Sequence, residues 1–163
     1  LQRLMGGDGE LNIELGSNHI RIQLDGIRFT SKLIDGRFPE YERVIPKEST
    51  NELKADRGSF QGALQRTAIL SNEKYRGIRL VIRDSGVILQ AHNPEQEEAE
   101  EELEVEYSGE DIEIGFNVNY LLDALGAVDG DEVTLSVQDS NSSCLIRRPG
   151  NDDCKFVVMP MRL

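Results

Sequence analysis

The order of two hydrophobic periodicities constrains the fold of this chain more than any other feature of its sequence. Two segments, residues 59–70 and residues 117–125, carry apolar side chains at the i, i+3, i+4 spacing of an amphipathic helix. Each is preceded by one short segment in which apolar and polar residues alternate, as in a half-buried strand, and is followed by three more. A unit of strand, helix and three strands therefore occurs twice, in residues 52–107 and in residues 112–161. The repeat predicts an α+β fold with two helices on one face of antiparallel sheets.

Each predicted helix has an apolar stripe. The first stripe consists of Phe60, Ala63, Leu64, Thr67 and Ala68, and the second of Val118, Leu121, Leu122 and Leu125. Asn117 is a favourable N-cap for the second helix, and Gly126 lies where that helix is expected to end. Strands of the two units are expected at residues 78–82, 87–89, 103–107, 112–116, 133–137, 144–146 and 156–159.

The first 34 residues contain part of a third unit. Residues 1–5 are expected to form the last turn of a helix, and the alternating segments 11–15, 19–24 and 27–34 are expected to form strands. The segment 35–49, with a glycine and two prolines, is predicted to be a linker. Because the leading strands have no half unit to pack against, we expect the chain to be a fragment.

The net charge of −12 is concentrated in one segment. Residues 95–113 contain eleven of the 30 acidic residues and no basic residue, so the rest of the chain, with 19 acidic and 18 basic residues, is close to neutral. The total charge argues against binding to nucleic acid, since phosphates are bound by basic surfaces, but the balance between residues 59 and 92 is positive. The acidic run is either a solvated face or loop, or a docking edge for a basic partner.

The sequence contains no recognisable catalytic or metal-binding motif. Cys144 and Cys154 are the two cysteines of the sequence, and no histidine lies near them. A zinc site needs about four ligands, so we expect two free thiols and no zinc site. His19 and His92 neighbour no nucleophile motif. We therefore expect no catalytic residue, no metal and no cofactor. The apolar runs are also too short for a membrane-spanning helix.

Two alternative functions remain open at this point. The carboxylates of residues 95–106 are compatible with a metal-dependent nuclease or phosphatase, which would show magnesium-dependent hydrolysis. A purely structural β-rich protein would bind no peptide. The last residues, 155–163, are apolar and contain two methionines, which indicates either a strand lining an apolar groove or a plain core strand.

Four motifs carry a resemblance to a known family. They are SKLIDGRFPEY at residues 31–41, ILSNEKYRG at 69–77, NPEQEEAEE at 93–101 and VVMPMRL at 157–163. These motifs occur in the same order as in the bacterial sliding clamp, the β subunit of DNA polymerase III, and the resemblance covers the whole chain. The chain resembles the proteobacterial form of this family. The resemblance implies the DNA clamp fold, with antiparallel sheets outside and two helices on the inner face. Residues 1–47 then correspond to the second half of the middle domain plus the linker, and residues 48–163 to the complete C-terminal domain.

The resemblance also implies a function without catalysis. Members of the family are processivity factors of DNA replication in the cytoplasm, at the nucleoid, and form a head-to-tail homodimeric ring around double-stranded DNA. The two helices would line the pore. The residues expected to face DNA are Gln61, Gln65, Arg66, Lys74 and Arg76. Contacts to phosphates without base readout would let such a ring slide.

A groove for partner peptides is implied between the middle and C-terminal domains. The implied partners are the polymerase III α subunit, the clamp-loader δ subunit, translesion polymerases, mismatch-repair proteins and ligase. The groove residues are expected to be Pro39, Arg43, Val44, Tyr75, Asn117, Tyr120, Asn141, Ser143, Val157, Val158, Met159, Pro160, Met161, Arg162 and Leu163. Asn141 stands where an apolar residue is expected, and the wall from the missing half-domain is absent, so we expect reduced peptide affinity.

The acidic run corresponds to a subunit interface in the family. The residues expected there are Ile69, Leu70, Glu95, Glu97, Glu98 and Glu101, facing an N-terminal domain that this chain does not contain. We therefore expect the full-length protein to be a homodimer and this chain alone to be monomeric. The net charge is then a property of one edge of the molecule.

Overall fold

A computed structural model describes residues 10–24, 26–37, 40–46 and 51–163. Contacts divide the chain into two compact units, Leu1–Pro39 and Glu40–Leu163. The helical turn predicted for residues 1–5 lies outside the described residues. The division places the segment 40–46 with the second unit, whereas the boundary drawn from the sequence lies after residue 47.

The first unit is a three-stranded antiparallel sheet. It consists of β1 (Asn12–Leu15), β2 (His19–Leu24) and β3 (Ile27–Lys32), in the order β1-β2-β3. The third strand ends two residues before the predicted end at residue 34. Ile13 and Leu15 lie opposite Ile22 and Ile20, which places their side chains on one face of the sheet. Ile13 and Leu15 are exposed, whereas Ile22 on the same face is buried.

The second unit contains the predicted repeat. Its elements are η2 (Tyr41–Arg43), β4 (Glu52–Asp56), α1 (Arg57–Thr67), η3 (Ala68–Leu70), β5 (Gly77–Arg83), β6 (Gly86–His92), β7 (Glu98–Glu104), β8 (Ile112–Asn117), α2 (Val118–Ala127), β9 (Glu132–Val137), β10 (Cys144–Arg147) and β11 (Phe156–Val158). From β4 onward the order strand, helix and three strands occurs twice, which confirms the unit predicted from periodicity.

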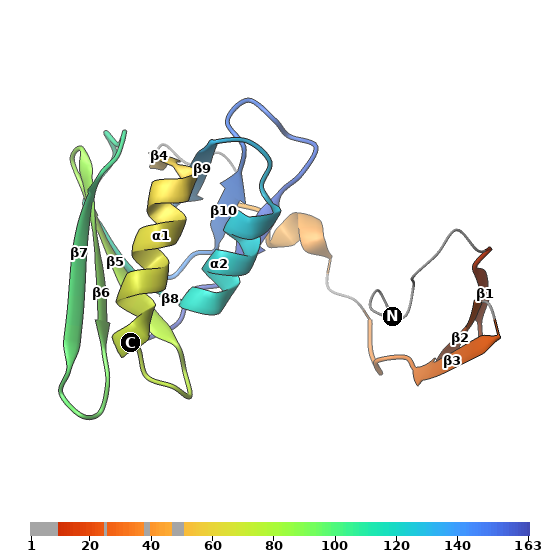
Figure 1. Ribbon diagram of the computed structural model, residues 1–163. Helices are drawn as coiled ribbons and strands as arrows, with labels where there is room; N and C mark the ends of the chain where they lie inside the picture. The colour runs from red at the N-terminus through yellow and green to blue at the C-terminus, as the bar shows by residue number, and fades with distance from the viewer. Residues whose placement is uncertain (1–9, 25, 38–39, 47–50) are drawn as a thin grey trace. The chain divides into compact units, whose positions relative to one another are not determined.

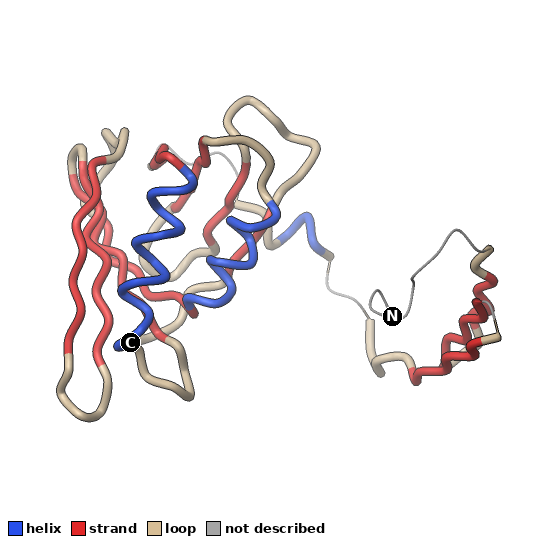
Figure 2. The backbone as a smooth tube through the Cα atoms, in the orientation of Figure 1, coloured by secondary structure: helices blue, strands red, loops and turns tan. Residues whose placement is uncertain are grey.

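Two four-stranded antiparallel sheets exchange strands between the repeats. Their orders are β11-β10-β9-β4 and β7-β6-β5-β8, so the first strand of each repeat pairs with a strand of the other. The helices α1 and α2 lie side by side, and both pack against strands of the sheets (Figure 1). Figure 2 shows the same arrangement as a layer of two helices against the strands. The fold is therefore α+β, as predicted.

Side chains that precede the helices fix where they begin. The Ser59 amide donates to Asp56 Oδ1 at 2.7 Å, and the Asn119 amide donates to Asn117 Oδ1 at 2.9 Å. The backbone and side-chain hydrogen bonds from Ser59 lower the pKa of Asp56. The predicted N-cap of the second helix is confirmed.

The predicted end of α2, with Leu125 as the last helical residue and Gly126 as the stop, is wrong by two residues. Gly126 stays helical and the helix continues to Ala127, with Val128 following as the cap. The left-handed backbone conformation falls instead at Gly130, whose φ is 93°. Arg57 stabilises this end, because its Nε donates to the Gly130 carbonyl at 2.6 Å and its Nη1 donates to the Leu125 carbonyl at 3.4 Å.

The acidic segment forms a strand earlier than predicted. Strand β7 covers Glu98–Glu104, whereas the strand was expected at 103–107. Exposed and half-buried residues alternate along β7, and Glu101 lies on the half-buried side, so glutamate occupies both faces of the strand. This hides the alternation of apolar and polar residues that marks other strands. Beyond β7, Glu106 bridges Lys54 through two backbone hydrogen bonds of 2.9 Å.

A mostly aliphatic core joins the helices to both sheets. Its largest fully buried side chains include Phe60 from α1, Leu121 from α2 and Phe116 from β8. Burial of this apolar surface is the main stabilising contribution to the second unit. Among the described residues no helix is long and apolar enough to span a membrane.

The two cysteines are expected to differ sharply in reactivity. Cys144 is buried in β10, and burial raises the pKa of its thiol to about 12, whereas Cys154 is exposed. At pH 8 we expect one thiol per folded chain to react with Ellman's reagent within minutes and the second to react only after denaturation. The control is Cys154→Ser, which should abolish the fast reaction. A fast reaction that survives in Cys154→Ser would contradict the burial of Cys144.

Candidate functional site

The second unit has an open groove between the segment 40–46 and the loop that precedes β10. Its volume is about 890 Å³. It is lined by Glu40, Tyr41, Glu42, Arg43, Val44, Ile45, Pro46, Gln138, Asn141, Ser142, Ser143 and Met159. Met159 is 59% exposed, and Tyr41 and Val44 are also exposed. The groove therefore presents apolar side chains to solvent, as a surface that buries a partner's apolar residues does.

Hydrogen bonds hold both walls of this groove. Ser143 Oγ donates to the Val44 carbonyl at 2.8 Å, which ties the segment 40–46 to the start of β10. In the opposite loop Asp139 Oδ1 accepts the amides of Asn141 and Ser142, each at 2.8 Å. These hydrogen bonds, with one from the Ser142 hydroxyl, lower the pKa of Asp139. Arg43 pairs with Glu40 on the rim.

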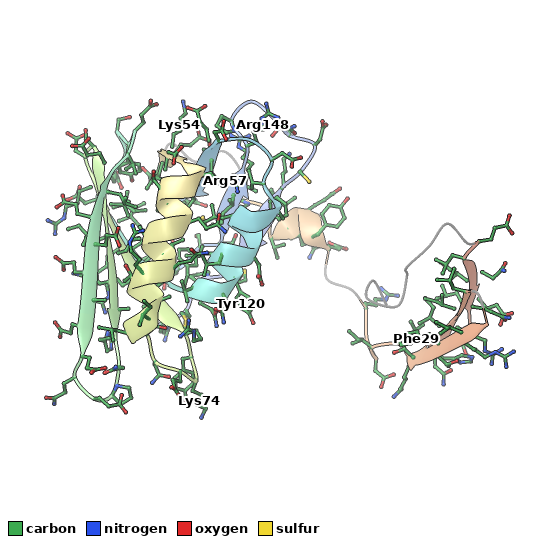
Figure 3. All side chains as sticks on the ribbon, in the orientation of Figure 1. Phe29, Lys54, Arg57, Lys74, Tyr120 and Arg148 are labelled. Carbon is green, nitrogen blue, oxygen red and sulfur yellow. The ribbon has the colours of Figure 1, made fainter. Side chains whose placement is uncertain are left out.

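A second hollow lies beside the last residues of the chain. Its volume is about 370 Å³, and its lining consists of Asn72, Tyr75, Gly77, His92, Asn93, Pro94, Met161, Arg162 and Leu163. Lys74 Nζ lies 5.0 Å from the centre of the Tyr75 ring, within the range of a cation–π contact. Asn117 Nδ2 donates to the Tyr75 carbonyl at 3.1 Å, which joins the start of α2 to this wall. Lys74 and Tyr120, at the start of α2, lie at the same end of the helix pair (Figure 3).

The residues predicted to face DNA lie on two segments of the second unit. Gln61, Gln65 and Arg66 lie on α1, whereas Lys74 and Arg76 lie in the loop that follows η3. Arg66 Nε donates to Glu101 Oε2 at 3.1 Å and Nη2 donates to Oε1, so this guanidinium is paired with a carboxylate of β7. The hydrogen bonds that Arg66 donates to Glu101 raise the pKa of Arg66. Arg76 has a positive φ of 49°, and its carbonyl accepts the Val118 amide at 2.8 Å.

A further group of basic residues lies at the other end of the helix pair. Lys54, Arg57 and Arg148 gather there in Figure 3. A Cβ atom on Gly130 would lie 3.5 Å from Arg148 Nε, and Arg57 donates to the carbonyl of the same glycine. These residues were not predicted as a group, because Arg148 lies far from Lys54 and Arg57 in the sequence and comes near them only in the fold.

The residues predicted for a subunit interface gather at one edge of the second unit. Strand β7 is the last strand of its sheet, so one of its edges is unpaired by any other described strand. Glu98 and Glu101 belong to β7, and Glu95 and Glu97 lie in the turn that precedes it. Ile69 and Leu70 belong to η3, which contacts β7, and Ile69 is 75% exposed. The arrangement combines an exposed apolar residue with a row of carboxylates.

Family models match nearly the whole chain. The C-terminal domain of the DNA polymerase III beta subunit matches residues 42–162, and the central domain of the same protein matches residues 1–40. The chain belongs to the DNA polymerase III beta subunit family. The resemblance drawn from four motifs is confirmed.

Relatives and solved structures agree with this assignment. The beta sliding clamp of Pseudomonas aeruginosa is 55% identical over 156 residues, or 96% of this chain and 42% of the relative. That of Escherichia coli K12 is 48% identical over 163 residues, or 100% of this chain and 44% of the relative. A crystal structure of the P. aeruginosa beta subunit matches with a TM-score of 0.82 at 54% identity, covering 99% of this chain and 45% of that one. Another, bound to griselimycin, matches with a TM-score of 0.78 at 54% identity, covering 99% and 44%. The chain spans less than half the length of these beta subunits.

The groove residues predicted for this beta-subunit chain divide between the two hollows. Arg43, Val44, Asn141, Ser143 and Met159 line the larger groove. Tyr75, Met161, Arg162 and Leu163 line the smaller hollow. Asn117, Tyr120, Val157, Val158 and Pro160 are in neither lining, and Pro39 lies outside the described residues. The larger groove is also lined by Tyr41, Ile45 and Pro46, which were not predicted, although their apolar character close to Val44 was a usable signal.

The described residues provide no evident metal site in this beta-subunit chain. Within the described ranges no group of three or more His, Cys, Asp or Glu side chains is placed to hold a metal ion. The carboxylates of β7 alternate along a strand instead of converging on one point. The hypothesis of a metal-dependent nuclease therefore has no support from the geometry of these residues.

Proposed function

We propose that the chain is part of a DNA sliding clamp that binds partner peptides in the groove between the segment 40–46 and the loop before β10. The full-length protein would form a head-to-tail dimeric ring around duplex DNA in the cytoplasm, at the nucleoid, and would have no catalytic activity. Partners would include the polymerase III α subunit, the clamp-loader δ subunit, translesion polymerases, mismatch-repair proteins and ligase.

The exposure of apolar side chains in a groove fixed by hydrogen bonds carries this proposal. Met159, Val44 and Tyr41 are open to solvent. The hydrogen bond from the Ser143 hydroxyl to the Val44 carbonyl holds this wall of the groove in place. Such a surface gains free energy by burying a partner's apolar residues, and a wall already in place reduces the entropic cost of binding. The relatives crystallised with griselimycin support a small-ligand site in this family.

Calorimetry with a synthetic peptide tests the proposal. The peptide copies the last residues of a bacterial polymerase III α subunit, and a peptide of the same composition in scrambled order is the control. Saturable binding of the first peptide alone is the expected result. Griselimycin is a second probe for the same chain. If neither the α-subunit peptide nor griselimycin binds, the groove assignment is wrong.

The acidic edge of β7 makes self-association of this chain unfavourable. Pairing of two β7 edges would set glutamates against glutamates, which repel one another. We expect light scattering at micromolar concentration in 0.15 M salt to give the mass of one chain, 18.3 kDa. A stable dimer under these conditions would contradict the assignment of this edge to a basic partner.

The proposed ring places the same carboxylates against basic residues of the adjoining subunit. Its helices α1 and α2 would face the DNA, with Gln61, Gln65, Arg66, Lys74 and Arg76 as the proposed contacts. Because Arg66 is already paired with Glu101, its contribution to DNA binding is expected to be smaller than that of an unpaired arginine.

A further inference from the structure

We propose that Gly77 and Gly115 form a seat for the side chain of Leu163, and that this seat positions the tail, residues 159–163. The inference rests on the proposed peptide groove for its functional consequence, because the tail carries Met159 of the larger groove and Met161 of the smaller hollow. The seat itself is a feature of the fold that exists without a bound peptide.

The two glycines lie on the outer face of one sheet. Strands β5 and β8 are neighbours, with Gly77 opposite Asn117 and Arg79 opposite Gly115. Ile78 and Phe116 point into the core, and side chains alternate along strands, so any side chain at Gly77 or Gly115 would leave the opposite face. These two adjoining strands therefore have no side chain at Gly77 and Gly115 on the face where Leu163 lies.

A side chain at either glycine would collide with the tail. A Cβ atom on Gly77 would lie under 3.0 Å from Leu163 Cδ2, a distance that real Cβ atoms essentially never show. On Gly115 it would lie 2.6 Å from the Met161 carbonyl oxygen and 2.7 Å from Leu163 Cγ. Neither glycine has a positive φ, so their backbone conformation does not require glycine. The physical reason for glycine at these two positions is therefore the space that the Leu163 side chain occupies.

A backbone hydrogen bond holds the tail at the same place. The Met161 amide donates to the Gly115 carbonyl at 2.9 Å. Three residues earlier the chain leaves β11, which pairs with β10 in the other sheet. The tail thus runs from one sheet to the edge strand of the other, and the seat fixes its far end.

The position of the tail affects both hollows together. Met159 and Met161 are separated by a single residue, Pro160, whose ring restricts the backbone between them. A tail displaced from Gly77 and Gly115 would move Met161 directly and would release the restraint on Met159. Gly77 and Gly115 are therefore positioning residues for the tail, although Gly77 also lines the smaller hollow.

Alanine substitutions at three glycines of one sheet test the seat. Gly77→Ala and Gly115→Ala introduce the collisions described above. Gly86→Ala, in β6, is the matched control, since its Cβ would meet its nearest atom at 3.7 Å, an ordinary contact. We expect the Met161 amide to exchange hydrogen about tenfold faster or more in the first two variants and at the parent rate in the control. Equal exchange in all three variants would overturn the proposal.

A double substitution separates the seat from a general loss of stability. The Gly77 Cβ meets only side-chain atoms of Leu163, whereas the Gly115 Cβ also meets the Met161 backbone. In a Leu163→Ala background, Gly77→Ala should cause no further increase in exchange, while Gly115→Ala should still cause one. Additive effects of Gly77→Ala and Leu163→Ala would contradict a direct contact between the two residues.

Peptide binding then tests the consequence of the seat. With the α-subunit peptide we expect Gly77→Ala and Gly115→Ala to weaken affinity about fivefold or more and Gly86→Ala to leave it unchanged. If the parent chain binds no peptide but the exchange results hold, the proposed function fails and the seat stands. If the parent binds and all three variants bind equally well, the positioning role is wrong.

Discussion

Replacing Phe60 by alanine is expected to lower the free energy of unfolding of the second unit by about 3–5 kcal/mol. Phe60 lies on α1 with 0% of its surface exposed and belongs to the core that joins the helices to both sheets. The substitution removes the transfer free energy of the ring and leaves a cavity that closely packed neighbours fill only in part. Urea denaturation followed by circular dichroism measures the change.

Tyr120→Ala provides the matched control for this substitution. Tyr120 is an aromatic residue on the other helix and is 61% exposed. Its truncation should change the free energy of unfolding by no more than about 0.5 kcal/mol, as is usual at exposed positions. Similar losses in Phe60→Ala and Tyr120→Ala would show that the core is not organised around α1 as described.

Truncation of Met159 is expected to weaken binding of the α-subunit peptide about tenfold or more. A methionine side chain that becomes buried on binding contributes on the order of 1.5–3 kcal/mol, and a loss of 1.4 kcal/mol corresponds to a factor of ten in affinity. Met159 lines the larger groove and is mostly exposed before binding, so it has surface to bury. Calorimetric titration of Met159→Ala against the parent chain measures the effect.

Two further variants show which hollow the peptide occupies. Met161→Ala removes the corresponding side chain from the smaller hollow, and Ile69→Ala removes an exposed apolar side chain from η3, outside both linings. A peptide that fills both hollows should respond to both methionine variants and not to Ile69→Ala. Unchanged affinity in both Met159→Ala and Met161→Ala would remove the basis for the groove.

Most of the fold was predictable because it follows from local periodicity. The two helices, the Asn117 cap of α2 and the repeated order of elements depend on residues close together in the sequence. Strand β7 was misplaced because glutamate occupies both of its faces and the contrast between the faces disappears. The exchange of β4 and β8 between sheets depends on pairing over long sequence separations, which periodicity alone does not specify.

The groove residues were predictable only through the family resemblance. The resemblance identified individual residues but not how they are grouped in space. Val44 and Met159 were selected on motif positions, and the structure brings both to one groove. Met161 and Leu163 line the other hollow, and this division depends on the course of the tail in three dimensions. The pairing of Arg66 with Glu101, two residues selected for different roles, likewise requires knowledge that α1 packs on β7.

The exchange of strands has a consequence for how this unit acquires its structure. The first strand of each repeat pairs in the sheet formed by the other repeat, β4 with β9 and β8 with β5. Either repeat alone would therefore lack one strand of its sheet and would leave part of its core uncovered. The repeats are therefore not autonomous folding modules, although the sequence presents them as successive copies. A chain divided between β7 and β8 would yield two halves that acquire structure only on mixing, by fragment complementation.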